Sequence, residues 1–123
     1  MDLTHFDQDG NAWMVDVSDK DITTRTAVAE GFIAINDAIY ERIEAGTIKK
    51  GDVLSVAQLA AIMGAKQTSN LIPLCHPLAL TKVEVHCTLV DGESPACTDA
   101  THNRAVKVRA TVKTTGKTGV EME

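Results

Sequence analysis

Residues 71–78, Leu-Ile-Pro-Leu-Cys-His-Pro-Leu, place a Cys-His pair between two prolines. Each proline fixes its own φ angle and pushes the residue before it toward an extended conformation. We therefore predict a stiff, non-helical ledge (residues 71–78) whose backbone amides and carbonyls are free to bind a ligand. The His76 imidazole adds a group that can donate or accept a proton. Leu74, Cys75 and His76 are thus candidate binding residues for a planar molecule.

Two lysines near this ledge suit an anionic ligand. Lys50 lies in a glycine-containing turn, and Lys66 ends an expected helix just before the ledge. Lysine is a compact charge for phosphate, and a desolvated lysine can exchange a proton near neutral pH. A lysine in a turn usually faces solvent, but the two together favour a phosphate site beside His76.

A pair of carboxylates stands at the end of the sequence. Glu121 and Glu123 are two residues apart, so on a strand they would share a face. Paired carboxylates can bind guanidine-like donors or serve as acid and base. A solvated polar strand face explains them equally well, and both interpretations stay open.

Two further motifs, for a P-loop and for a zinc site, lack the spacing that these sites require. Residues 116–118, Gly-Lys-Thr, resemble the end of a P-loop, but that motif needs a glycine where Thr111 stands. The side chains that could form a zinc site match no usual ligand spacing, and they are Cys75, His76, His86, Cys87, Cys97 and His102. We therefore reject the P-loop and expect no metal site.

Helical periodicity supplies two of the elements that must position these groups. Apolar residues recur at spacings of three and four over residues 24–45, and Gly46 is well placed to end a helix there. A second helix is predicted over residues 56–66. The sequence at 55–58, Ser-Val-Ala-Gln, has the spacing of a capping box and would start it.

Strict alternation of apolar and polar residues predicts the strands. It runs over residues 82–89 and again over 106–113, and a shorter stretch covers 13–17. The polar segment 91–104 would link the two longer strands as a hairpin loop. We therefore predict one α+β domain, with an antiparallel sheet whose apolar face is covered by helices.

The bulk composition is that of a soluble globular protein. The chain has 123 residues, of which 44% are hydrophobic, and this length fits one domain over residues 1–123. No apolar run approaches the roughly 20 residues that a membrane span needs, and the first residues lack the features of a signal peptide. Three cysteines without framework spacing indicate reduced thiols and a cytoplasmic location.

Charge is unevenly distributed along the chain. The net charge is −5, but residues 1–45 contain ten acidic and three basic residues, whereas residues 46–123 contain seven and nine. An acidic protein is a poor candidate for non-specific nucleic-acid binding, because the phosphate backbone is itself anionic. The basic second half could still gather around a small anion.

Several segments together resemble the molybdenum cofactor biosynthesis protein C family, whose members are cyclic pyranopterin monophosphate synthases. The matching segments cover nearly the whole chain in order, and they are 14–18, 24–27, 50–53, 65–66, 71–78, 82–85 and 115–123. The most specific of them are the ledge and the sequence Thr-Gly-Val-Glu-Met-Glu at 118–123.

The resemblance implies an enzyme that converts 3′,8-cyclo-7,8-dihydro-GTP to cyclic pyranopterin monophosphate and releases pyrophosphate. It implies no redox cofactor and leaves open whether magnesium accompanies the triphosphate. It also implies a ferredoxin-like α+β domain, assembled as a homohexamer, a trimer of dimers, with each active site at a dimer interface.

The resemblance also implies roles for individual residues. Lys50 would act in acid–base or phosphate chemistry, and Lys66 would hold the triphosphate. The substrate would lie along the ledge, and the residues implied to bind it are Leu74, Cys75, His76, Met122 and Glu123, with Glu121 and Arg25 in the same pocket.

One departure from the family concerns the end of the chain. The family pattern continues past Glu-Met-Glu into a helix that carries an Asp-x-x-Lys pair regarded as catalytic, whereas this sequence stops at Glu123. We expect a truncated chain, and feeble catalysis if those groups are missing. The alternative interpretation is a catalytically inactive relative that binds a nucleotide or regulates.

Overall fold

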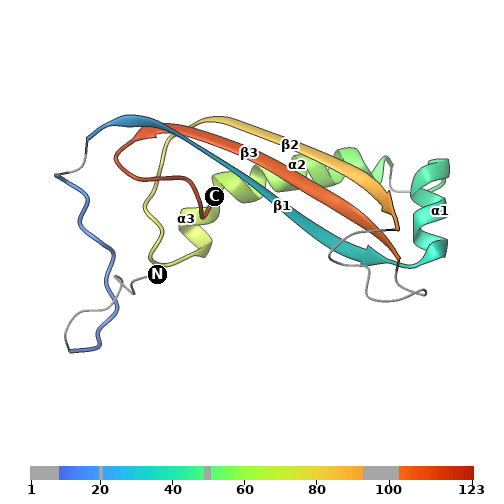
Figure 1. Ribbon diagram of the computed structural model, residues 1–123, viewed down its shortest axis with the longest axis horizontal. Helices are drawn as coiled ribbons and strands as arrows, with labels where there is room; N and C mark the ends of the chain where they lie inside the picture. The colour runs from blue at the N-terminus through green and yellow to red at the C-terminus, as the bar shows by residue number, and fades with distance from the viewer. Residues whose placement is uncertain (1–8, 20, 49–50, 93–102) are drawn as a thin grey trace.

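Six helices and strands make up the part of the chain that this computed structural model describes, which is residues 9–19, 21–48, 51–92 and 103–123. In chain order they are β1 (Thr23–Ile35), α1 (Asp37–Ala45), α2 (Val53–Lys66), α3 (Thr68–Leu71), β2 (Leu80–Asp91) and β3 (Arg104–Gly116) (Figure 1). The predicted α+β class is confirmed.

β3 lies in the centre of the sheet, between the two other strands. The strand order is β1-β3-β2, and both pairs are antiparallel. β1 pairs with β3 along its whole length, whereas the ladder between β2 and β3 has one irregularity, between Leu80 and Lys82. The strands predicted over 82–89 and 106–113 are confirmed, and each extends a few residues further.

The apolar face of the sheet packs against the helices. Val85, Cys87 and Val106 are buried at its centre. The side chains that pack against them come from both longer helices, namely Ile43 of α1 and Leu54, Ala57, Ala61 and Ile62 of α2. Burying one such valine stabilises the fold by roughly 1.5–3 kcal/mol. The predicted alternation of the two strands, with helices on their apolar face, is confirmed.

The helix predicted over residues 24–45 is wrong for its first half, because residues 23–35 form β1. Apolar residues at 28, 32 and 35 fit a helical spacing. However, the β-branched residues of this segment favour strands, and Gly31 lowers helix propensity by about 1 kcal/mol. The partner strand decides the outcome, because pairing with β3 satisfies backbone groups along all 13 residues.

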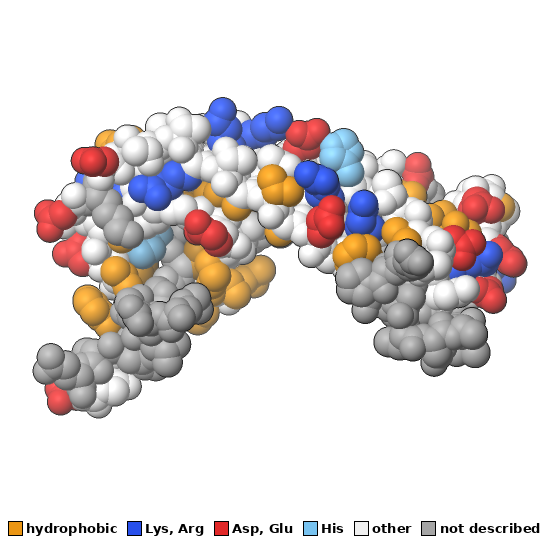
Figure 2. Space-filling model, in the orientation of Figure 1, with side chains coloured by type: hydrophobic (Ala, Val, Ile, Leu, Met, Phe, Trp, Pro, Cys, Tyr) orange, Lys and Arg blue, Asp and Glu red, His pale blue; other side chains and the backbone are white. Residues whose placement is uncertain are grey.

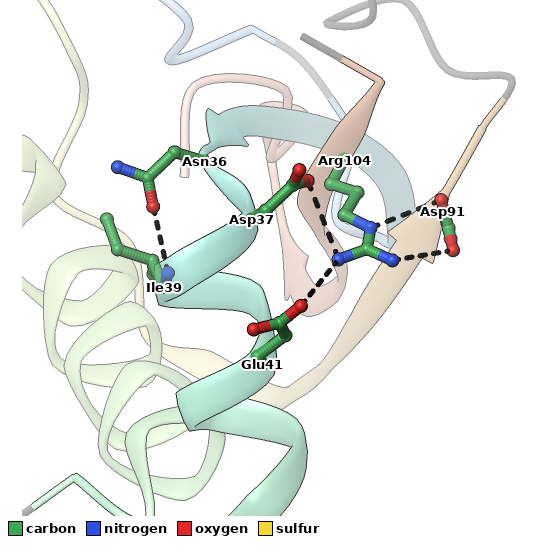
Figure 3. Close-up of polar contacts among 6 residues, drawn as sticks. All are labelled: Asn36, Asp37, Ile39, Glu41, Asp91 and Arg104. Carbon is green, nitrogen blue, oxygen red and sulfur yellow. Dashed lines mark hydrogen bonds and ion pairs between the residues drawn. The ribbon is translucent and has the colours of Figure 1, made fainter. Parts of the chain in front are cut away.

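The first helix therefore begins only at Asp37. Asn36 is its N-cap, and the Oδ1 atom of Asn36 accepts a hydrogen bond of 2.8 Å from the amide of Ile39 (Figure 3). Gly46 ends α1 as predicted, with a φ of 69°. Glycine tolerates this left-handed conformation because it has no Cβ atom.

α2 begins at Val53, before the predicted start. Its N-cap is Asp52, whose Oδ1 atom accepts hydrogen bonds from the amides of Leu54 and Ser55 at 3.1 and 3.3 Å. Hydrogen bonds from the Ser55 amide and hydroxyl lower the pKa of Asp52. The capping box predicted at 55–58 is therefore wrong, whereas the predicted C-terminal end of this helix is confirmed.

Arg104 connects α1 to the adjacent end of the sheet (Figure 3). Its guanidinium lies 3.4 Å from both carboxylate oxygens of Asp91 and 3.5 Å from Asp37, and Glu41 is at 4.0 Å. The same group stacks over the Tyr40 ring at 4.2 Å from its centroid. This cluster therefore holds α1 at the end of the sheet opposite to α3 (Figure 1).

Two segments lie outside the regular elements. Residues 13–17, predicted as a strand, have no regular secondary structure. Most of the predicted loop 91–104 falls outside the described residues, although β2 ends and β3 begins at its two limits. Within the described ranges, no helix combines the length and apolar character needed to cross a bilayer.

Candidate functional site

A cavity of about 690 Å³ is lined by segments of the chain that lie at the end of the sheet remote from α1 (Figure 1). Residues from three segments line it, namely 12–17, the ledge at 71–78 and the segment 118–123 that follows β3. Figure 2 shows apolar side chains gathered on the concave side of the molecule, whereas basic side chains follow its convex side over the strands. A cavity of this size is typical of small-molecule sites.

Beyond Leu71, which ends α3, the ledge is non-helical, as its two prolines predict. After α3 the chain makes a turn in which the amide of Cys75 donates to the carbonyl of Ile72 at 3.1 Å. Just past the ledge, the hydroxyl of Thr114 on β3 donates to the carbonyl of Ala79 at 2.6 Å. Thr114 is only 1% exposed, so a buried side chain of the central strand fixes the ledge to the sheet.

His76 joins the ledge to the segment 12–17. Its Nε2 atom lies 2.7 Å from the carbonyl oxygen of Val15. A carbonyl can only accept, so Nε2 must carry a proton, and in the neutral imidazole Nδ1 is then a free acceptor. The ammonium of Lys117, which directly follows β3, donates to the carbonyl of Ser18 at 3.1 Å and connects the chain after residue 17 to the end of the central strand.

Cys75 lies inside the cavity wall as a protonated thiol. It is 8% exposed, and its Sγ atom lies 3.6 Å from the carboxylate of Glu123. Burial raises the pKa of the Cys75 thiol, and the negative charge of Glu123 raises it further. Because the thiolate is the reactive form of cysteine, this thiol is poorly suited to nucleophilic attack or metal binding.

Glu121 is placed by a glycine beside it. The carboxylate of Glu121 lies so close to Gly119 that a Cβ atom there would overlap with it. The absence of a side chain at Gly119 therefore permits this position of the Glu121 carboxylate. Residues 118–123 form no strand, so the shared strand face predicted for Glu121 and Glu123 is wrong, although both line the cavity.

Most of the candidate residues from the sequence come together in this cavity. Those that line it are Leu74, Cys75, His76, Glu121, Met122 and Glu123. They come from two motifs that are separated by the whole of β2 and β3. The roles of these residues stay predictions.

The basic candidates do not line this cavity. Lys66 is exposed at the end of α2, and α3 separates it from the ledge. Arg25 is turned toward β3, where its Nε atom donates to the carbonyl of Gly116 at 3.4 Å. Lys50 lies outside the described residues. Of the described residues, no lysine or arginine lines the cavity.

The described residues also contain no group of three His, Cys, Asp or Glu side chains that could hold a metal ion. Of the candidates for a zinc site, His86 is exposed and pairs with Glu84 at 2.8 Å. Cys97 and His102 lie outside the described residues.

Sequence reasoning missed part of the cavity wall. Val15 and Val17 line it. The signal for them in the sequence is the alternation of apolar and polar residues at 13–17, but this alternation predicts a strand and not a cavity wall. Thr118 also lines the cavity, and its buried hydroxyl has no hydrogen-bond partner among the described residues. No pattern in the sequence distinguishes this threonine from the others.

Comparisons with known proteins agree with these motifs. A sequence profile described as the MoaC family matches residues 14–123. A protein of Staphylococcus aureus (strain bovine RF122 / ET3-1) named cyclic pyranopterin monophosphate synthase is 51% identical over 122 residues, which cover 99% of this chain and 70% of that protein. A protein of the same name from Halalkalibacterium halodurans is 50% identical, with 99% and 69% covered.

Proposed function

The chain belongs to the MoaC family, and we propose that it acts as a cyclic pyranopterin monophosphate synthase of molybdenum cofactor biosynthesis. In this reaction 3′,8-cyclo-7,8-dihydro-GTP is rearranged to cyclic pyranopterin monophosphate, and pyrophosphate leaves. One observation carries the proposal. The two most specific motifs, the ledge and the segment 118–123, line a single cavity of a size suited to a small molecule.

The proposed binding mode follows from the chemistry of the cavity wall. The planar ring lies along Leu74 and Cys75 on the ledge. Glu121 and Glu123 accept hydrogen bonds from N–H donors of the ring, because carboxylates are acceptors only. The Nδ1 atom of His76 accepts a further proton or hydrogen bond, since Nε2 is engaged by Val15.

The departing pyrophosphate requires positive charge. Charge develops on the leaving oxygens, and cationic side chains in a water-poor cleft stabilise it. We assign this task to Lys50 and Lys66, with Arg25 at the margin of the pocket. Because the described part of the cavity has no cation of its own, we propose that the dimer interface completes it with basic groups.

Apolar side chains that are exposed in the single chain support such an assembly. Val56, Leu59 and Met63 follow one another along α2 and are 57–60% exposed, and Val28 and Ile33 are exposed on the edge strand β1. Exposed apolar surface of this kind marks interfaces. We propose a ferredoxin-like domain in a homohexamer, a trimer of dimers. We also propose a cytoplasmic location, since Cys75 and Cys87 are free thiols.

The alternative is an inactive relative that binds the nucleotide without converting it. The absence of a cation among the described lining residues favours this alternative. Turnover distinguishes the two functions. The protein at its natural length is incubated with the cyclised dihydro-GTP, and we expect one pyrophosphate for each pyranopterin formed. Tight binding without pyrophosphate release would support the inactive relative instead.

The position of Glu121 gives a further prediction. In Gly119→Ala the new Cβ displaces the Glu121 carboxylate, whose flexible side chain can rotate away. We expect substrate affinity to fall about tenfold, the cost of one charged hydrogen bond, with little change in melting temperature. The measurement is calorimetric binding beside thermal unfolding.

Gly116→Ala is the matched control for this prediction. A Cβ at Gly116 would meet only the Thr114 hydroxyl, at an ordinary 3.9 Å. Affinity should therefore stay unchanged. An equal loss of affinity in both variants would contradict the proposed role of the Glu121 position.

A further inference from the structure

The contact between the Cys75 thiol and the Glu123 carboxylate has no role in the proposed binding mode, although each residue has one there. We propose that Cys75 is a positioning residue, whose thiol proton orients the Glu123 carboxylate in the cavity wall. The two side chains would then act as one hydrogen-bonded unit. The consequence for substrate binding rests on the proposed function, whereas the existence of the unit does not.

The geometry favours a contact with the whole carboxylate. The Sγ atom of Cys75 lies 3.6 Å from Oε1 and 3.7 Å from Oε2 of Glu123, distances at which a thiol can donate a hydrogen bond. The thiol therefore faces the gap between both oxygens. The pair also joins the ledge to the segment 118–123, so it connects the two motifs that form the cavity.

The protonation state makes the thiol the donor. Burial raises the pKa of Cys75, and the charge of Glu123 and its hydrogen bond raise it further, so the thiol keeps its proton well above neutral pH. The other titratable groups that line the cavity are His76 and Glu121. The Nε2 atom of His76 is held by the Val15 carbonyl, and the backbone carbonyl of His76 is a second acceptor for the Cys75 thiol, at the same 3.6 Å as Oε1 of Glu123.

A fixed carboxylate should bind better than a mobile one. A glutamate side chain loses rotational entropy when a ligand immobilises it. A hydrogen bond that already restricts the side chain in the free protein makes this entropy loss on binding smaller. Serine could provide a similar O–H donor at this position, whereas alanine could not. Cysteine therefore contributes its proton here and not its nucleophilicity.

Cys87 provides an internal reference within the same protein. It is also buried, and its pKa is raised by burial alone, without a carboxylate partner. A change at Glu123 should therefore affect Cys75 and leave Cys87 unchanged. A general loosening of the fold would affect both thiols.

The first test is a titration that needs no substrate. The ultraviolet absorbance of the thiolate follows Cys75 in a Cys87→Ser, Cys97→Ser background, and Cys87 in a Cys75→Ser, Cys97→Ser background. At a fixed alkaline pH, Glu123→Gln should raise the thiolate fraction of Cys75 by about fivefold or more, as loss of one nearby charge predicts. The Cys87 titration should not move. An unchanged Cys75 titration, or equal shifts of both thiols, would overturn the proposal.

The second test separates positioning from structure. Cys75→Ala should raise KM about tenfold with a smaller change in kcat, since ground-state binding is what the unit improves. Cys75→Ser should recover most of the affinity. If serine is as poor as alanine, the donor role is wrong. If the protein shows no turnover, the proposed function is wrong. The titration would still test whether Cys75 and Glu123 form a hydrogen-bonded unit.

Discussion

Replacing Lys50 with alanine is expected to lower turnover by about 10²–10³-fold while the oligomer stays intact, because one charge that stabilises the departing pyrophosphate is lost. The measurement is pyrophosphate release under single-turnover conditions, with native mass spectrometry for the assembly. Lys50 lies outside the described residues, so its proposed role rests on the family resemblance and on the phosphate chemistry of lysine.

Two further variants define what Lys50 does. Lys49→Ala removes the charge next to Lys50 in the sequence, and it should leave turnover near normal. Lys50→Arg keeps the charge but provides a group that does not deprotonate in proteins. Recovery by arginine would indicate phosphate binding, and failure to recover would indicate proton transfer. Near-normal product formation by Lys50→Ala would exclude the residue from catalysis.

His76→Ala is expected to reduce kcat/KM by about 10²-fold or more, the range for loss of a group that transfers a proton. The change removes Nδ1 from the cavity, and it also removes the 2.7 Å bond that Nε2 makes to the Val15 carbonyl. The segment 12–17 should then become more sensitive to limited proteolysis. Steady-state kinetics and proteolysis together check both consequences.

His86→Ala is the matched control for this experiment. His86 is exposed on β2, where its Nε2 atom contacts Glu84, and it is not among the residues that line the cavity. Kinetics and proteolysis should both stay as in the wild type. Comparable losses in the two variants would mean that the effect of His76→Ala is not specific to the cavity.

The strands β2 and β3 and the ledge were predictable because their signals are local. Alternation at 82–89 and 106–113 fixes which side chains face the helices, and a strand with that pattern has one stable orientation. Likewise, the prolines of the ledge restrict the backbone wherever it lies. The glycine that ends α1 acts through its own φ angle.

β1 could not be predicted in this way. Its apolar spacing fits a helix, and only the 13-residue pairing with β3, distant in the sequence, makes it a strand. The start of α2 was missed for a related reason. Both Asp52 and Ser55 are good caps, and the hydrogen bonds that Asp52 actually accepts decide between them.

The sequence by itself determined the chemical groups of the site, the stiff ledge that carries three of them and the two strands behind it. Only the tertiary structure decided that the ledge, the segment 118–123 and residues 12–17 line one cavity, with Lys66 and Arg25 outside it. The physical reason is that side-chain type and backbone restriction are properties of neighbouring residues. The meeting of distant segments depends instead on long-range contacts, such as Thr114 with Ala79 and Cys75 with Glu123.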